Sequence, residues 1–330
     1  HLAQALKVRR IKQISAAIVL FMLFSGLDII GHTYFTVVPQ PFEHHLEWWA
    51  TFFQYSSITT GMFWVFNQFI PVTLIMLLVY NERKISNFGF LAALCLFFSP
   101  YPTAGIGAFM ITYAGVCFVK SADKKQFWLN EIFSVQNIIG AFWLLPLSAL
   151  YFITNSEGMD GLYYVFDFTT PERLFLFMVL EFLLYTILLF PQFCRNVFFL
   201  TMFISLLLIP FLRLDQQNNF CMRASIPAIV VLAVFTIRFL FEERREHPIK
   251  TGILCILLVI GAMTPLTEFY RGIYFVSKTQ KLSLVQDGIY TLNGQLIRMP
   301  EFGWDVNHQY TAKEYKTDIF WQYLSQKLPQ

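Results

Sequence analysis

The chain has 330 residues, of which 56% are apolar, 18% aromatic and only 14% charged, and its mean hydropathy is +0.53. This composition excludes an ordinary soluble domain and predicts an all-α polytopic membrane protein. A net charge of +3 is too small and too scattered to indicate a nucleic-acid partner. The five cysteines show no metal-ligand spacing and no disulfide framework. Because the chain begins with His1 rather than Met, we expect an N-terminally truncated fragment.

The first apolar helix is predicted over about residues 15–35, after a basic flank within residues 1–12. It places Asp28 and His32, four positions apart, on one face near its outer end. Residues 37–57 contain no Lys or Arg, and the stretch Glu43-His44-His45-Leu46-Glu47-Trp48-Trp49 predicts a short amphipathic helix in the outer interface. A second helix, about 61–80, carries Asn67 and Gln68 in its first turns.

Residues 88–119 are typical of a short re-entrant hairpin. The first apolar run, 88–98, is too short to cross a hydrocarbon core of about 30 Å. The sequence Ser99-Pro-Tyr-Pro-Thr103 interrupts it before a second run, 104–119. Irregular backbone at that depth needs polar partners, so this turn and its Tyr101 should face protein or a wet cavity.

The rest of the chain predicts an interfacial helix and then five apolar helices, for a total of about nine apolar helices. The interfacial helix covers about 126–133, and the apolar helices cover about 135–153, 174–190, 197–212, 226–241 and 253–264. The run over about 174–190 carries Glu181 near its middle. Residues 1–266 form the predicted transmembrane domain, and residues 267–330 predict a small external C-terminal domain, α+β or irregular, with a strand-like run at 289–292 followed by Asn293-Gly294.

Basic residues indicate the orientation. They concentrate in the segments assigned to the inner face, whereas the short outer loops hold only Arg213 and Arg223. By the positive-inside rule the N-terminus should be cytoplasmic and the C-terminal tail extracytoplasmic.

A dense polar segment, Asp215 to Pro227, lies between two apolar runs and needs water, a ligand or internal partners. The topology places it on the same face as the stretch from Asp28 to Gln68, which predicts one outward-facing cavity. The candidate substrate-binding residues are His32, His44, His45, Trp48, Gln54, Asn67, Gln68, Tyr101, Asp215, Asn218, Asn219 and Arg223. The structural alternatives are an Asp28–His32 pair, tryptophans that anchor the interface, amides that cross-link helices, turn packing by Tyr101, and an Arg223–Asp215 ion pair.

Five stretches carry a resemblance to a known group. They are Gly26-Leu-Asp-Ile-Ile30, His45-Leu-Glu-Trp-Trp49, Phe53-Gln-Tyr-Ser-Ser57, Phe63-Trp-Val-Phe-Asn-Gln68 and Asn218-Asn-Phe-Cys-Met-Arg-Ala-Ser-Ile-Pro-Ala228. Together they resemble a group of uncharacterised bacterial multi-spanning proteins, whose layout is similar to that of GT-C membrane glycosyltransferases. The resemblance implies an external acid, for which Asp28 or Glu47 fits, and basic residues such as Arg223 and His44 or His45 that grip a lipid phosphate.

The function expected on these grounds is glycosyl transfer at the outer face of a bacterial plasma membrane, in cell-envelope polysaccharide biosynthesis. The partners would be membrane lipid, a polyprenyl-phosphate-linked sugar and a saccharide or cell-envelope acceptor. The alternatives are a transporter or flippase of a lipid-linked saccharide, and a non-catalytic envelope-assembly protein. The sequence identifies no definite cofactor. The Glu43 to Glu47 cluster could hold a divalent metal, and interfacial solvation is the alternative interpretation.

Overall fold

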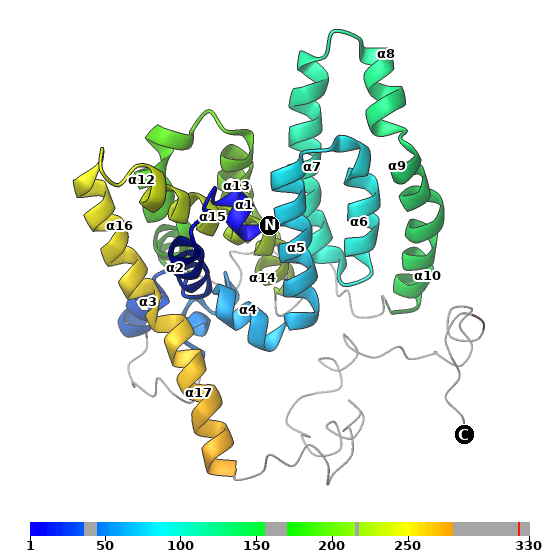
Figure 1. The fold of residues 1–330 in the computed structure, drawn as a ribbon. Coiled ribbons are helices and arrows are strands. Elements are labelled where there is room, and N and C mark those ends of the chain that lie inside the picture. The colour runs from blue at the N-terminus through cyan, green and yellow to red at the C-terminus, as the bar shows by residue number, and fades with distance from the viewer. Residues whose placement is uncertain (36–44, 156–169, 215–217, 280–322, 324–330) are drawn as a thin grey trace.

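The computed structural model describes residues 1–35, 45–155, 170–214, 218–279 and 323, and every element within these ranges is helical (Figure 1). Five helices are long and apolar enough to cross a membrane: Pro100–Lys120, Val135–Phe152, Pro171–Phe193, Asn219–Glu242 and Pro248–Tyr274. Three shorter apolar helices accompany them, at Ile11–Met22, Ile85–Leu96 and Val197–Phe211. The chain is therefore an all-α protein of the multi-pass membrane class. The strand-like run at 289–292 lies outside the described residues.

The elements follow the predicted runs, with more breaks. The first half contains α1 (Leu2–Ala5), α2 (Ile11–Met22), α3 (Asp28–Phe35), η1 (Leu46–Ala50), α4 (Ile58–Trp64), α5 (Phe66–Glu82), η2 (Ile85–Asn87), α6 (Phe88–Leu96), α7 (Pro100–Lys120), α8 (Lys124–Phe127), η3 (Trp128–Ile132), α9 (Val135–Ile139), η4 (Gly140–Leu144) and α10 (Leu145–Asn155). The second half contains α11 (Pro171–Met178), η7 (Val179–Leu183), α12 (Leu184–Phe193), α13 (Val197–Leu208), η8 (Ile209–Phe211), α14 (Asn219–Ala224), α15 (Ile226–Glu242), α16 (Pro248–Gly261) and α17 (Met263–Thr279).

Helix α15 is the centre of the fold (Figure 1). Every residue from Ile226 to Phe239 is buried, and α5, α7, α12 and α13 pack around it. A helix that is apolar all round is stable only when it is surrounded. Protein rather than lipid therefore covers the helix predicted at 226–241, and this fixes the position of the polar segment that precedes it.

The helix predicted as continuous over 15–35 is broken. Helix α2 ends at Met22 and α3 begins at Asp28, with non-helical backbone between them. Other elements satisfy this backbone: the Ile58 amide donates to the Phe24 carbonyl (3.2 Å) and the Leu27 amide to the Leu180 carbonyl (3.1 Å). The Tyr185 hydroxyl donates to the Ser25 carbonyl (3.1 Å). Such a break is stable inside a membrane domain only because protein groups replace the lost helical hydrogen bonds.

The hairpin has the predicted short first arm, α6, but its second arm, predicted over 104–119, is the 21-residue α7, which is long enough to cross a membrane. Its turn is shorter than predicted, because Tyr101–Thr103 belong to the first turn of α7. Ser99 is the N-cap residue, and Pro100 occupies the first helical position. Proline fits there because its missing N–H would have had no helical partner anyway.

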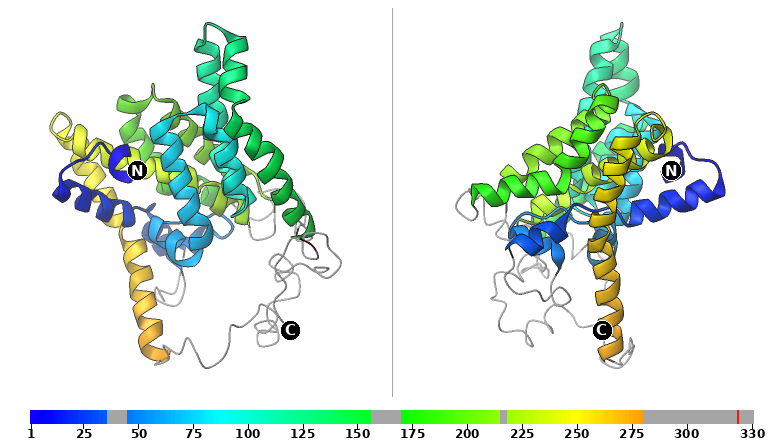
Figure 2. Two further views of the ribbon diagram at one scale, coloured as in Figure 1. Left: turned by 45° about the vertical axis from the view of Figure 1, so that its right-hand side comes forward. Right: turned by 90° about the vertical axis from the view of Figure 1, so that its left-hand side faces the viewer.

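Two further expectations are corrected by burial and helix length. The stretch predicted to lie in the interface contains η1, in which Leu46, Glu47, Trp49 and Ala50 are buried. The helix predicted to end at 264 continues through α17 to Thr279, so the predicted domain boundary at 266/267 lies within a helix. Figure 2 shows α17 extending away from the helical body.

The segments predicted for opposite sides of the membrane are separated in the structure. Near one end of α15, Lys7 pairs with Glu242 (3.6 Å), and Asn81 donates to the His1 carbonyl (2.9 Å). At the other end, the Asn218 amide donates to the Phe52 carbonyl (2.9 Å), which joins two predicted outer segments. Which end faces the cytoplasm stays a prediction.

The close approach of α7 to α14 gives the first test. A Cβ added at Gly105 would lie 2.2 Å from the Ala224 carbonyl oxygen, whereas one added at Gly107 would meet nothing within 4 Å. We expect Gly105→Ala to lower the free energy of unfolding by about 1–3 kcal/mol, because the two helices must separate. Gly107→Ala is the matched control and should be neutral or stabilising. Thermal unfolding in detergent measures both, and equal midpoints would contradict the packing.

Candidate functional site

A cavity of about 620 Å³ opens between the η1–α4 region and α14. Its wall combines aromatic rings, hydroxyls, amides and two basic side chains. The lining residues are His45, Trp48, Thr51, Phe52, Gln54, Ser56, Thr60, Trp64, Val65, Asn218, Asn219, Met222 and Arg223. Two segments that are far apart in the chain therefore build a single site.

Six residues chosen from the sequence line this cavity: His45, Trp48, Gln54, Asn218, Asn219 and Arg223. The structure holds the two walls together through the Asn218–Phe52 hydrogen bond. Asn218 itself adopts a left-handed backbone conformation (φ 55°) just before α14, a conformation that asparagine tolerates better than most residues. From Asn218 onward, the described part of the polar segment is therefore largely helical, in α14 and the first residues of α15.

Among the described lining residues, Arg223 supplies a positive charge. Arg223 forms no ion pair with any carboxylate within the described ranges, and its buried Nε has no hydrogen-bond partner there. No Asp or Glu is among the described lining residues. A guanidinium beside amides and hydroxyls is suited to an anionic, hydroxyl-rich ligand, because charge-assisted hydrogen bonds are the strong ones.

His45 is held from behind by a network that includes α17. Its Nδ1 lies 2.9 Å from Glu268 Oε1, and Trp64 Nε1 donates to Glu268 Oε2 (2.8 Å). Arg271 donates to Glu268 Oε1 (2.7 Å), and its Nη1 also lies 2.7 Å from His45 Nδ1. Since Nδ1 is engaged, Nε2 is the ring nitrogen left for a ligand.

Sequence analysis missed Glu268 and Arg271. They lie three positions apart on α17, and both are buried. Charges at that spacing on the continuation of an apolar helix were the available signal. The predicted helix ends at about 264, and this boundary places both residues in the predicted external tail.

The two carboxyls predicted as catalytic do not line the cavity. Glu47 is 2% exposed and accepts hydrogen bonds from the Gln54 side chain (2.7 Å) and the Ser57 amide (2.8 Å). Burial, with the charge of Asp28 adding to it, raises the pKa of Glu47 to about 8. Burial likewise raises the pKa of Asp28. Gln54 lines the cavity and donates to Glu47, so its side chain separates this carboxyl from the cavity.

The other predicted residues are placed as follows. His32 lies on α3, and Asn67 and Gln68 lie in the first turn of α5; none of the three lines the cavity. The Tyr101 ring lies in the first turn of α7 and packs against Phe220 of α14, with ring centroids 5.5 Å apart. Glu43, His44 and Asp215 lie outside the described residues.

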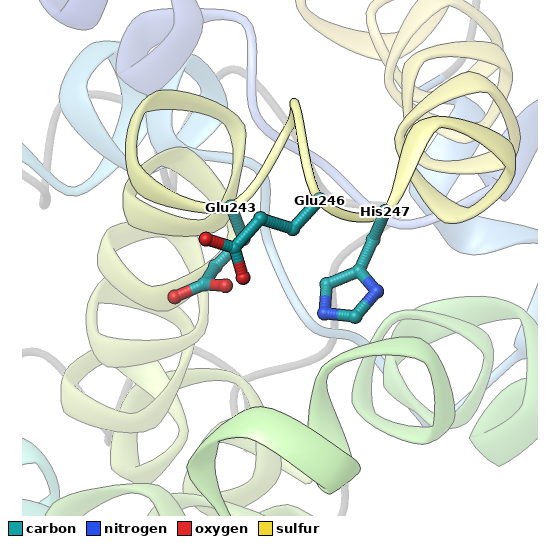
Figure 3. A group of neighbouring side chains, drawn as sticks. All are labelled: Glu243, Glu246 and His247. Atoms are coloured by element: carbon teal, nitrogen blue, oxygen red, sulfur yellow. The ribbon is translucent and has the colours of Figure 1, made fainter.

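A metal ion was one reading of the Glu43 to Glu47 cluster. Glu47 and His45, its described members with suitable ligand atoms, face different partners, Gln54 and Glu268. Within the described part of the chain, one group of three residues that could bind a metal comes together: Glu243, Glu246 and His247, with ligand atoms within 4.8 Å of one another (Figure 3). It lies at the opposite end of the 24-residue α14–α15 helix from the cavity, about 36 Å away.

Comparisons with protein families, with curated proteins and with solved structures find no match for this chain.

The buried Glu47 gives a test of pH dependence. A carboxyl whose pKa rises from 4.5 unfolded to about 8 folded stabilises the fold fully below pH 4.5, and this contribution is lost as the pH rises to about 8. The loss approaches about 1.4 kcal/mol per pH unit in that window. We expect Glu47→Gln to flatten this fall, because glutamine keeps the shape without ionising. Unfolding midpoints between pH 4.5 and 8 measure it.

Glu82→Gln is the control, since Glu82 is exposed at the end of α5. It should leave the wild-type pH profile unchanged. A Glu47→Gln profile as steep as that of the wild type would contradict the assignment.

Proposed function

We propose that this protein is a membrane glycosyltransferase that binds a lipid-phosphate-linked sugar in the cavity between η1–α4 and α14. The observation that carries the proposal is the wall itself: Arg223 and His45 stand beside amides, hydroxyls and indole rings, with no carboxylate among the described lining residues. A sugar phosphate offers the matching groups: an anion, hydroxyls and an apolar ring face.

Each class of wall residue has a distinct partner in this proposal. Arg223 binds the phosphate oxygens. Gln54, Asn218 and Asn219 hydrogen-bond sugar hydroxyls. Trp48, 54% exposed, and Trp64, 56% exposed, offer ring faces for the apolar side of the sugar. The His45 ring lies 4.7 Å from Trp48 and 5.1 Å from Trp64, so it stands between the two tryptophans.

The reaction is a displacement at the anomeric carbon. The acceptor hydroxyl oxygen forms a bond to this carbon, the bond from carbon to phosphate oxygen breaks, and the lipid phosphate leaves with the bonding electron pair. The hydroxyl proton passes to His45 Nε2. This requires the tautomer in which Nδ1–H donates to Glu268 and Arg271 donates to Glu268 instead of to Nδ1, so that Nε2 is unprotonated and acts as general base. Arg223 stabilises the charge on the leaving phosphate.

The proposed location is the outer face of a bacterial plasma membrane. Arg244, Arg245 and Lys250 lie beyond the end of α15 that is far from the cavity, and Lys7 joins them through Glu242. With that end in the cytoplasm, the cavity faces outward. Saccharide or other cell-envelope acceptors would reach it there, and a GT-C-like layout is part of the same proposal.

Loss of Arg223 tests the binding step. We expect Arg223→Ala to weaken binding of a polyprenyl-phosphate sugar about 10- to 100-fold, the range for a lost hydrogen bond to a charged group. Binding of the same sugar as a neutral glycoside should change little. Titration in nanodiscs measures both, with Arg244→Ala as the control at the far end of α15. Equal losses for charged and neutral ligands would contradict the phosphate role.

Loss of His45 tests the chemical step. We expect His45→Ala to lower the rate of glycosidic product formation about 100-fold or more, the usual contribution of a general base, while donor binding changes much less. His247→Ala, in the turn before α16, is the control. A full rate in His45→Ala would remove His45 from the reaction.

The second candidate is a transporter of the same lipid-linked saccharide. The observation in its favour is that Asp28 and Glu47 are enclosed instead of lining the cavity. The turnover assay separates the two functions: new glycosidic product identifies the transferase. Saccharide that crosses proteoliposomes without product identifies the transporter, and in that case Arg223→Ala still weakens binding.

A further inference from the structure

Three carboxyl side chains are buried beside the cavity without lining it. Asp28 (1% exposed) begins α3, Glu47 (2%) lies in η1, and Glu181 (1%) lies in the π-turn η7. No Lys, Arg or His forms an ion pair with any of them within the described ranges. Buried acids without a cation must be neutralised in another way, because burying a bare charge is very costly.

Asp28 and Glu181 differ in the donors that reach them. Asp28 accepts hydrogen bonds from Ser25 Oγ (3.0 Å), Trp49 Nε1 (3.2 Å) and Thr264 Oγ1 (3.0 Å). Neither oxygen of Glu181 accepts a hydrogen bond of normal geometry from a described residue, and the nearby Trp49 indole donates to Asp28 instead. The Glu181 carboxyl lies against the backbone of Gly26, two residues before Asp28, so the two carboxyl groups are close neighbours. Two carboxyl groups form a hydrogen bond only when one of them carries a proton.

The packing around Glu181 favours a proton over a metal ion. A Cβ added at Gly26 would lie 2.0 Å from Glu181 Oε2, so the backbone of the α2–α3 break touches the carboxyl. A divalent cation needs several oxygen ligands around it. A proton can bind between two neighbouring carboxyl groups without any further ligand. Glycine at position 26 is what allows the approach.

We infer that Glu181 and Asp28 form a proton-binding site, in which Glu181 carries one proton and donates it to a charged Asp28. The three donors on Asp28 stabilise its charged form, and the absence of donors on Glu181 suits its neutral form. The site lies at a π-turn, an irregularity that is frequent at functional positions. A buried acid within a membrane-spanning helix is itself a functional indication.

The other titratable groups near the pair are Glu47 from η1, Tyr55 from the segment between η1 and α4, Tyr185 from α12 and Cys221 from α14. His32, four residues after Asp28 on α3, is the basic residue of the same helix, and it forms no ion pair with either carboxyl within the described ranges. The Tyr185 hydroxyl donates to the Ser25 and Leu257 carbonyls, so it does not neutralise the pair. The proton is therefore the positive charge available to the two carboxyls within the described structure.

The pair also touches the elements that build the cavity. Trp49, which donates to Asp28, belongs to η1 with Trp48 of the wall, and Thr264 lies one helical turn before Glu268 on α17. Proton occupancy should therefore change ligand affinity, a consequence that rests on the proposed function. Typical coupling between two sites is about fivefold or more.

The proton itself is tested on ligand-free protein in nanodiscs by infrared spectroscopy. At a pH of about 9.5, Glu47 is ionised, since its pKa is about 8. The wild type should keep a protonated-carboxyl C=O band there, and ¹³C-labelled glutamate should shift this band while labelled aspartate should not. A wild type without the band overturns the proposal without need of any variant.

Glu181→Gln should lose the band and remain folded, because the glutamine amide can donate to Asp28 in place of the proton. Glu172→Gln, an exposed acid in α11, is the control and should keep the band. A band that survives in folded Glu181→Gln also overturns the proposal. Failure of a polyprenyl-phosphate sugar to bind would count against the proposed function alone, since the infrared experiment contains no ligand.

Discussion

The break between α2 and α3 is the constraint on which the rest of the structure depends. Non-helical backbone inside an apolar helical protein must find hydrogen-bond partners within the protein. Here these partners come from α4, from the π-turn η7 and from Tyr185, so the break fixes how three distant segments pack. Asp28 is the first residue of α3 after the break. Its carboxyl group lies beside Glu181 and accepts a hydrogen bond from Trp49 of η1. The candidate cavity is therefore a consequence of how one backbone irregularity is satisfied.

The helical class and the two walls of the cavity were predictable from sequence. Long apolar runs leave few alternatives to membrane helices, and the alternation of loops places Gln54 and Arg223 on one side. The break at Ser25–Gly26 was not predictable, because no proline marks it and its partner Leu180 lies far along the chain. The burial of η1 was missed for a similar reason. Paired tryptophans suggest an interface, and only tertiary packing shows that Trp49 points inward to Asp28.

Glu268 illustrates how a single boundary error hides part of a site. The apolar pattern of α16 weakens after Thr264, since Glu268 and Arg271 interrupt it. Charged residues usually end a membrane helix in sequence reading. Here they continue it, because each neutralises the other and both hydrogen-bond to residues of the η1–α4 region. The sequence pattern misplaces the end of this helix because Glu268 and Arg271 are buried and paired instead of exposed to solvent.

Charge is sorted across η1, and this sorting determines what the cavity can bind. His45 and Trp48 line the cavity, whereas Glu47 is buried and accepts from Gln54 and Ser57, and Trp49 donates to Asp28. If Asp28, Glu47 and Glu181 were all ionised, their negative potential would act through a low-dielectric interior on any anion beside Arg223. Protons on Glu47 and Glu181 leave Asp28 as the charged carboxyl of the three and remove most of that opposition. A cavity for a phosphate-linked ligand can therefore lie close to three buried acids when Glu47 and Glu181 are neutral.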